Sequence, residues 1–509
     1  MKKTTLSAIL FLFSICAYTQ DLPSTLKAAL PYLKQKTAVK GIYETYAQQT
    51  LWTENGQLNA KGNKVWEILQ NVEQYGLLPT QYQVAGIKLA LTEQNNNLAD
   101  VFLTDGLALL CQHLNSGAVN PAKIQKNIVS ANKGNDLAAM LENAYAAQDL
   151  FAYLESIQPQ YAGYKKLLKT LNNYREFAQK GGWTKLPANI TQLPKEQAAV
   201  LLTERLVQSN DWNPNMLITD PEYTLTDAVS QYQRTHALPQ TRILDAATIA
   251  SINVPVENRI AKIKLSLERF RWLPTNPAEE YILVNLPAYR AVFMENNEML
   301  IKTNVIVGAA KTATPLIVSK ASRIVINPTW TVPYSIAINE ILPKLNEQPT
   351  YLKINDMDLL DVNGNIVTLT DAQIKALTRE TFRYDIRQRA SEDNSLGRYV
   401  LYFPNKHFIY MHDTNAPYLF AKEKRALSHG CIRTQEIERI CKYLIENNSD
   451  TSIETAKAAY DNKETLTVPL RDKIDVYIQY FTVWAEADDV YFLNDVYGYD
   501  KQLSPLMAK

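Results

Sequence analysis

The segment Ala-Leu-Ser-His-Gly-Cys-Ile-Arg, residues 426–433, places a cysteine two residues after a histidine and next to a glycine. A thiol nucleophile needs a base within hydrogen-bond reach, donors for a developing oxyanion and an accessible position. His412 lies at the end of one expected strand, and Cys431 follows 19 residues later at the end of the next. Because the ends of neighbouring strands meet in space, we predict that His412 is the base for a Cys431 nucleophile.

The residues next to Cys431 fit the same chemistry. A free thiol with a pKa of ~8.5 is mostly protonated at neutral pH, and an adjacent imidazole can hold the thiolate as an ion pair. Gly430 leaves room beside the sulfur for a substrate carbonyl. A helix expected from about Thr434 would direct backbone N–H groups at the oxyanion. Arg433 offers a bidentate fork to a substrate carboxylate, with a structural ion pair as its alternative.

The positions of the other cysteines do not favour a metal site or a disulfide. Cys111 and Cys441 lie on apolar helical stripes and are expected in the core. A zinc site needs about four ligands, but Cys431 is the one cysteine in its region and no acidic residue follows at ligand spacing on a helix. We therefore predict no metal and no cofactor.

The N-terminus is typical of an exported protein. Residues 1–19 combine two lysines, an apolar run and then small or polar residues, which is the layout of a secretory signal peptide. The run is too short to span a bilayer, since a spanning helix needs roughly 20 apolar residues. We expect localisation in the periplasm or cell envelope. An uncleaved or lipid-modified N-terminal anchor is the alternative, and it would be the only membrane contact.

Export limits how the cysteines can pair, and the charge balance limits which partners the chain can bind. Without residues 1–19 the chain keeps Cys111, Cys431 and Cys441, an odd number, so at least one thiol is free in a monomer. The 53 basic residues nearly balance the 52 acidic residues. This balance gives no electrostatic footprint for nucleic acid or an anionic membrane surface.

The predicted fold class is multi-domain α+β. Residues 20–192 carry helical periodicity and form a scaffold without convergent acid/base residues. Short helices are expected over residues 193–255. Residues 256–509 are rich in β-branched and aromatic residues and are predicted as a β-rich, sandwich-like domain, with an inserted helical cap at residues 335–395.

The segment at residues 193–255 resembles the small peptidoglycan-binding module of cell-wall enzymes. The residues that carry this resemblance are Ala228, Val229, Tyr232, Gln233, His236, Leu238, Leu244, Asp245, Thr248 and Asn253. The Asp-Gly turn usual in that module is replaced by Pro-Gln-Thr-Arg at residues 239–242. A three-helix spacer is therefore the alternative to a glycan-binding module.

His412, fifteen intervening residues and the motif at residues 428–433 together resemble the signature of YkuD-like L,D-transpeptidases. The resemblance extends to the large, multi-domain (YcbB-like) members. It includes the segments at residues 326–337, 394–414 and 419–433, the closing strands, and the order of scaffold, small module and catalytic domain.

This resemblance implies a definite reaction. Cys431 would attack the carbonyl of the third-residue diamino acid in a peptidoglycan tetrapeptide stem, expel D-Ala and form a thioester. His412 would activate the thiol and relay a proton for the acceptor. The side-chain amine of a second stem would then form a 3→3 cross-link. The implied partners are donor and acceptor stems, together with other cell-wall synthesis proteins, and carbapenems should acylate Cys431.

The resemblance also assigns residues around the catalytic pair. Tyr410 and Trp330 would line the cleft, with core aromatics as the alternative. Ser428 and His429 match the motif, and one of them would orient His412 or supply a hydrogen bond. Asp413 or a backbone carbonyl would orient the imidazole.

Other functions stay open from the sequence. Water as acceptor would make the chain an L,D-carboxypeptidase, and a lipoprotein lysine would make it an anchoring transpeptidase. A different class is a non-catalytic wall-binding scaffold. The presence of Cys431, His412, Gly430 and Arg433 together favours the enzyme, because an inactive domain would not need them.

Overall fold

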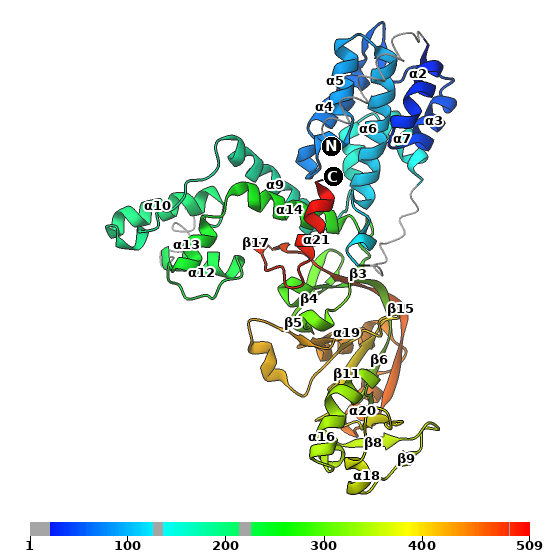
Figure 1. The fold of residues 1–509 in the computed structure, drawn as a ribbon, viewed down its shortest axis with the longest axis vertical. Coiled ribbons are helices and arrows are strands. Elements are labelled where there is room, and N and C mark those ends of the chain that lie inside the picture. The colour runs from blue at the N-terminus through cyan, green and yellow to red at the C-terminus, as the bar shows by residue number, and fades with distance from the viewer. Residues whose placement is uncertain (1–20, 126–135, 213–224, 488, 509) are drawn as a thin grey trace. The chain divides into compact units, whose positions relative to one another are not determined.

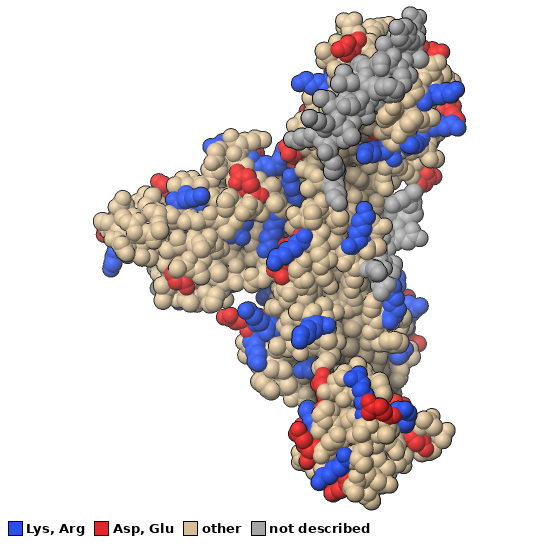
Figure 2. Space-filling model, in the orientation of Figure 1, with Lys and Arg blue, Asp and Glu red and all other residues tan. Residues whose placement is uncertain are grey.

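The computed structural model describes residues 21–125, 136–212, 225–487 and 489–508 (Figure 1). The predicted signal peptide at residues 1–19 lies outside these ranges. Within the described part of the chain, no helix is long and apolar enough to cross a membrane. Figure 2 shows basic and acidic side chains interspersed on the face drawn.

The chain forms two compact units, which divide it differently from the predicted domains. The first unit contains Met1–Pro277 together with Phe481–Lys509, and the second contains Ala278–Tyr480. The predicted domain at residues 256–509 therefore contributes its first helix and its last segment to the first unit.

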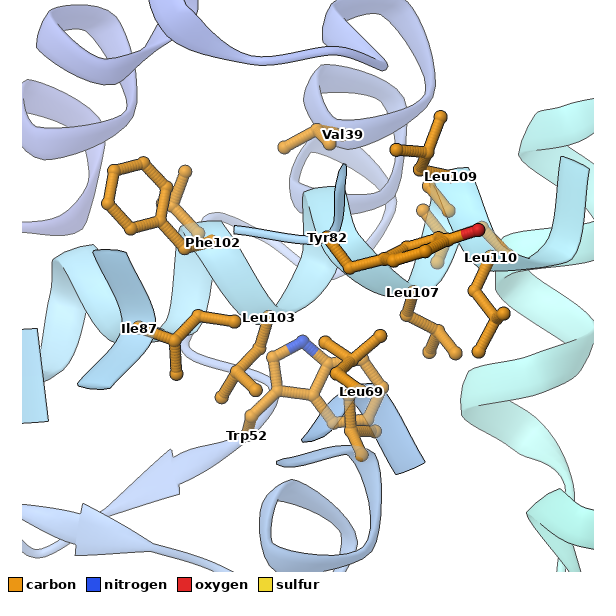
Figure 3. Packing of buried hydrophobic residues seen from close by; sticks show 14 of the residues in the cluster. Val39, Trp52, Leu69, Tyr82, Ile87, Phe102, Leu103, Leu107, Leu109 and Leu110 are labelled. Carbon is orange, nitrogen blue, oxygen red and sulfur yellow. The ribbon is translucent and has the colours of Figure 1, made fainter. Parts of the chain in front are cut away.

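The N-terminal part of the first unit is helical, as predicted. Its helices are α2 (Leu22–Ala29), α3 (Lys36–Thr45), α4 (Ala60–Gln70), α5 (Val84–Thr92), α6 (Asn96–Ser116), α7 (Leu137–Ala146) and α8 (Leu150–Ser156), with a hairpin of β1 (Thr53–Glu54) and β2 (Gln57–Leu58). Helix α6 is buried on nearly all sides, because apolar residues surround its axis. Figure 3 shows Trp52, Leu103 and Leu107 in this core.

The remainder of the first unit combines helices with a small hairpin. It contains α9 (Ala162–Gln179), α10 (Lys195–Gln208), α12 (Leu225–Thr235), α13 (Ala246–Ile252), α14 (Val256–Phe270), β16 (Val483–Glu486), β17 (Asp489–Phe492) and α21 (Tyr499–Met507). Helices α10, α12 and α13 share one apolar core in the predicted small module. The Val483 N–H donates to Ser266 Oγ at 2.8 Å, and the Phe270 and Phe481 rings stack with centroids 4.0 Å apart.

The second unit is built on a closed sheet, which corrects the predicted sandwich. The closed strands run in the order β5 (Glu298–Gly308), β14 (Ile432–Thr434), β12 (Met411–His412), β11 (Tyr399–Tyr402), β6 (Ile317–Ile326), β15 (Leu466–Gln479), β3 (Glu280–Asn285) and β4 (Arg290–Glu295). The ring closes because β5 pairs with β4 through residues 298–304 and with β14 at Val305 and Ile306. Strand β13 (Ala426–Ser428) also pairs with β5, and helices α19 (Ile437–Asn448) and α20 (Ile453–Asp461) follow in sequence.

The inserted cap contains a sheet as well as the predicted helices. Its strands are ordered β7 (Trp330–Thr331), β10 (Asp385–Gln388), β8 (Met357–Leu360) and β9 (Ile366–Val367). Its helical segments are α15 (Tyr334–Ile336), the π-helical turn η8 (Ala337–Ile341), α16 (Leu342–Glu347), α17 (Tyr351–Ile354) and α18 (Asp371–Lys375). Because these elements bury a core of their own, the cap is a small α/β subdomain that begins near Trp330.

Candidate active site

The register of two short strands places the predicted catalytic residues on neighbouring segments of the sheet. Strand β12 pairs in parallel with β14, with Met411 opposite Ile432 and His412 opposite Arg433. Met411 and Ile432 are fully buried on one face of the sheet. Side chains alternate along a strand, so His412, Arg433 and Cys431, which directly precedes β14, lie toward the other face.

Ser428 holds the turn that carries the cysteine. Its hydroxyl accepts a hydrogen bond from the Gly430 N–H at 3.1 Å and donates to the Cys431 carbonyl at 2.6 Å. Its own carbonyl accepts from the Thr312 hydroxyl at 2.9 Å. The structure therefore brings the Ser428 hydroxyl to the backbone of the turn, where it positions Cys431, and not to an open cleft.

Gly430 adopts a backbone conformation that favours glycine. Its φ is +125°, and a Cβ at this position would lie 3.2 Å from Ile409 Cδ1. The Thr314 hydroxyl fixes the peptide by donating to the Gly430 carbonyl at 2.7 Å. Glycine is therefore needed here for the shape of the turn, in addition to the predicted room for substrate.

The Cys431 sulfur lies among groups of the segment before β12. The thiol contacts the Phe408 carbonyl, with Sγ and O 3.7 Å apart in the arrangement of a long hydrogen bond. Burial raises the pKa of the Cys431 thiol, while the backbone N–H and the hydroxyl of Tyr410 and the charge of Arg433 oppose this increase. Burial also raises the pKa of Tyr410, so its hydroxyl remains a donor beside the sulfur.

His412 is neutral at physiological pH in this arrangement. Burial and then the neighbouring Arg433 charge lower the pKa of His412 to about 3, against a smaller opposing contribution from the backbone carbonyls of Asp413 and Leu396. Its Nδ1 has no hydrogen bond of good geometry within the described structure. A neutral imidazole is the form of His412 that can accept a proton from a thiol.

Asp413 does not orient the imidazole through its carboxylate. The carboxylate accepts a hydrogen bond from the Arg398 N–H at 3.0 Å. It packs against Gly397, where φ is +63° and a Cβ would lie 2.4 Å from the Asp413 side chain. Of the two orienting groups predicted, the backbone carbonyls of Asp413 and Leu396 lie near enough to affect the His412 pKa, although neither forms a hydrogen bond of good geometry with Nδ1.

The surroundings of Arg433 suit a side chain that binds a substrate carboxylate. Its side chain is partly buried beside His412, and within the described ranges its guanidinium forms no hydrogen bond or ion pair. Burial lowers the pKa of Arg433, against a smaller increase from Tyr418 and Cys431. A desolvated, unpaired guanidinium attracts a carboxylate strongly. The predicted alternative, a structural ion pair, has no counterpart among the residues that the structure describes.

Two of the predicted substrate-binding residues contact the cap or belong to it. The His429 imidazole, in the cysteine motif, pairs with the Glu340 carboxylate of η8. Trp330, in β7, packs against the cap core and lies close enough to the Tyr410 hydroxyl to lower its pKa. Sequence reasoning missed Glu340, because no motif or spacing marks a lone carboxylate in an inserted subdomain.

The helix predicted from about Thr434 begins later in the structure, after a short strand. Residues Ile432–Thr434 form β14, and helix α19 begins only at Ile437. Helix α19 thus begins too late for its first N–H groups to be the oxyanion donors that were predicted next to Cys431. The Cys431 N–H has no partner among the backbone hydrogen bonds of the described residues, so it remains a candidate donor.

The other two described cysteines lie in the core, away from the predicted site. Cys111 and Cys441 are fully buried, as predicted from their helical stripes. Burial raises the pKa of the Cys111 thiol to about 12. Within the described ranges, no group of three or more His, Cys, Asp or Glu residues is placed to hold a metal ion.

Two segments of the chain match models of known protein families. Residues 37–171 match a family model of a scaffold domain, and residues 279–453 match the model of the YkuD L,D-transpeptidase catalytic domain. A curated protein of Haemophilus influenzae named "Putative L,D-transpeptidase" is 32% identical over 248 residues, 48% of this chain and 50% of that protein. The chain thus spans about half the length of the relative it matches. The predicted resemblance of the catalytic domain is confirmed, and His412 and Cys431 both lie inside the matched segment.

Proposed function

We propose that this protein is an exported cysteine L,D-transpeptidase that forms 3→3 cross-links between peptidoglycan tetrapeptide stems. The observation that carries the proposal is the placement of Cys431, neutral His412 and unpaired Arg433 by the paired strands β12 and β14. The YkuD match over residues 279–453 supports the same reaction class.

Arg433 would both bind the donor stem and prepare the base. A substrate carboxylate on the Arg433 fork would offset the charge that lowers the His412 pKa. The base would therefore become stronger when the donor is bound, which couples activation of the thiol to the presence of substrate.

The chemistry then proceeds through one covalent intermediate. The Cys431 thiol turns from the Phe408 carbonyl, His412 takes its proton, and Sγ bonds to the carbonyl carbon of the diamino acid. The oxyanion forms near the Cys431 N–H. The bond to D-Ala breaks as His412 returns the proton to the leaving amine, and a Cys431 thioester remains.

The second half of the reaction reverses these roles. The side-chain amine of an acceptor stem attacks the thioester carbonyl and gives its extra proton to His412. The new C–N bond forms, the C–S bond breaks, and the sulfur recovers a proton from His412. Water in place of the amine would hydrolyse the thioester, so the partition between the two acceptors decides the product.

Product analysis tests the proposal. Purified disaccharide-tetrapeptides are incubated with the wild type and with Cys431→Ala, and mass spectrometry measures 3→3 dimers and released D-Ala. The wild type should yield both products. Cys431→Ala should yield neither, with an unchanged melting temperature. Dimers formed by the variant would exclude the cysteine mechanism.

A carbapenem adduct gives an independent readout of the same thiol. We expect a single acyl adduct that peptide mapping places on Cys431, because Cys111 and Cys441 are fully buried. Export is proposed from residues 1–19, and N-terminal sequencing of the chain recovered from the cell envelope would show whether they are removed.

A further inference from the structure

Phe408 has an unusual backbone conformation. Its φ is +55°, in the left-handed region that glycine and asparagine tolerate and bulky aromatic residues rarely adopt. Its side chain is 83% exposed, so the ring gains little packing that would offset the strain. A strained residue persists where surrounding contacts fix it and where it serves a purpose.

Asn405 explains how the conformation is held. Its side-chain oxygen accepts from the His407 and Ile409 N–H groups at 3.1 and 3.0 Å. Its side-chain nitrogen donates to the Phe403 and Ile409 carbonyls at 2.9 and 2.7 Å. These bonds use only backbone groups of the turn. The turn therefore does not depend on which side chain residue 408 carries.

The turn lies directly against the nucleophile. The Phe408 carbonyl is the group that the Cys431 thiol contacts, at 3.7 Å. The next residue, Ile409, approaches the position of a Cβ on Gly430 to 3.2 Å. The following Tyr410 carbonyl accepts from the Ile432 N–H at 3.1 Å. The backbone of an exposed aromatic residue thus lies against the reacting sulfur.

We infer that the Phe408 ring is a substrate contact that packs on the aliphatic part of the stem peptide beside the attacked carbonyl. This inference rests on the proposed function. The stem offers methylene groups of its diamino acid and a D-Ala methyl near the carbonyl, and an aromatic face gains free energy by covering them. Arg433 takes the carboxylate, and Phe408 covers the apolar part.

Binding measurements without turnover test the inference. Calorimetry compares Cys431→Ala with Cys431→Ala/Phe408→Asn, using a sugar-free tetrapeptide as ligand. Asparagine tolerates the left-handed conformation and keeps the backbone carbonyl, so only the ring is lost. We expect the Kd to rise about five- to tenfold, the size of one lost aromatic contact, while the melting temperature stays equal or rises.

A matched control separates ring loss from a general loss of exposed apolar surface. Val362, 85% exposed in the segment between β8 and β9 of the cap, is replaced by asparagine in the same Cys431→Ala background. The Kd of this control should not change.

The outcomes distinguish the inference from the proposed function. An equal Kd for the Phe408→Asn protein would overturn the inference, and so would weaker binding seen only with sugar-bearing ligands, since the ring would then contact glycan. A fall in melting temperature that accompanies the loss of binding would also count against it, as a structural role. Failure of the proposed function would appear separately, as wild-type protein that makes no dimers.

Discussion

Gly430 links the shape of the cysteine turn to its chemistry. In Gly430→Ala, the positive φ should cost about 1–2 kcal/mol of the free energy of unfolding. The new Cβ should also push Ile409 away from its place 3.2 Å distant. Since Ile409 lies between Phe408 and Tyr410, the sulfur would lose its alignment. We expect cross-linking to fall at least tenfold, measured as the initial rate of dimer formation.

Gly364 provides the matched control for this variant. Its φ is +82°, and a Cβ there would meet nothing within 4 Å. Gly364→Ala should show a similar loss of stability with an unchanged cross-linking rate. Equal rates in the two variants would contradict a positioning role for Gly430.

The neutral state of His412 predicts a pH-dependent stability. Because burial and the Arg433 charge lower its pKa from 6.5 to about 3, the unfolded chain binds one more proton than the folded chain between these values. The free energy of unfolding should therefore fall as pH decreases below 6.5, by about 1.4 kcal/mol per pH unit from this residue. His412→Gln should lack this contribution, as measured by urea unfolding between pH 5 and 8.

The comparison of the two proteins isolates the histidine. Above pH 7 the difference in unfolding free energy between wild type and His412→Gln should stay constant. If the unfolding free energies of wild type and His412→Gln changed in parallel down to pH 5, His412 would not be held neutral by burial.

At the residue scale, the sequence predicts which groups react better than it predicts their protonation state or backbone conformation. The pair of His412 and Cys431 follows from residue type and spacing. The neutral resting state does not, because it depends on burial and on Arg433 lying opposite His412 in the sheet. Phe408 was missed for a similar reason, since a left-handed φ has no signal in an aromatic residue.

At the scale of elements, strand periodicity identified the sheet but not its closure. Alternation of side chains is the same in a sandwich and in a closed sheet. What closes this sheet is the length of β5, whose two halves pair with β4 and with β14. Pairing partners so far apart in sequence cannot be read from local pattern.

The cap contacts the cysteine motif through Glu340 and His429. Both side chains are about half exposed, so the pair should add less than ~1 kcal/mol to overall stability. Its expected effect is local. Glu340→Gln should speed hydrogen exchange in η8, because the cap loses its contact with the motif, while the melting temperature stays nearly constant.

Glu347, an exposed carboxylate on α16 of the same cap, supplies the control. Glu347→Gln should leave exchange in η8 unchanged. Identical exchange in the two variants would mean that the Glu340 contact does not hold the cap.

At the scale of the whole molecule, the two compact units predict an asymmetric response to truncation. Residues 481–509 belong to the first unit, where Phe481, Val483 and Leu503 are fully buried. Truncation after Tyr480 should lower the melting temperature of the first unit by several degrees and leave that of the second nearly unchanged. Calorimetry of the full-length and truncated chains measures both melting temperatures. An unchanged melting temperature of the first unit would contradict the assignment of residues 481–509 to that unit.

The change from a helical N-terminal region to a β-rich region was predicted from periodicity along the sequence. The return of the last segment to the first unit did not, because it depends on long-range contacts such as the stacking of Phe481 on Phe270. Local pattern identified β-strands there without showing which unit they join.

In the proposed mechanism, Cys431 carries the acyl group between donor and acceptor. The most direct measurement is the intact mass of the protein mixed with a tetrapeptide donor whose diamino acid amine is blocked, so that no acceptor is present. We expect a mass increase equal to the donor acyl group, mapped to Cys431 and absent from Cys431→Ala. Release of D-Ala without any adduct on Cys431 at the earliest times would contradict this mechanism.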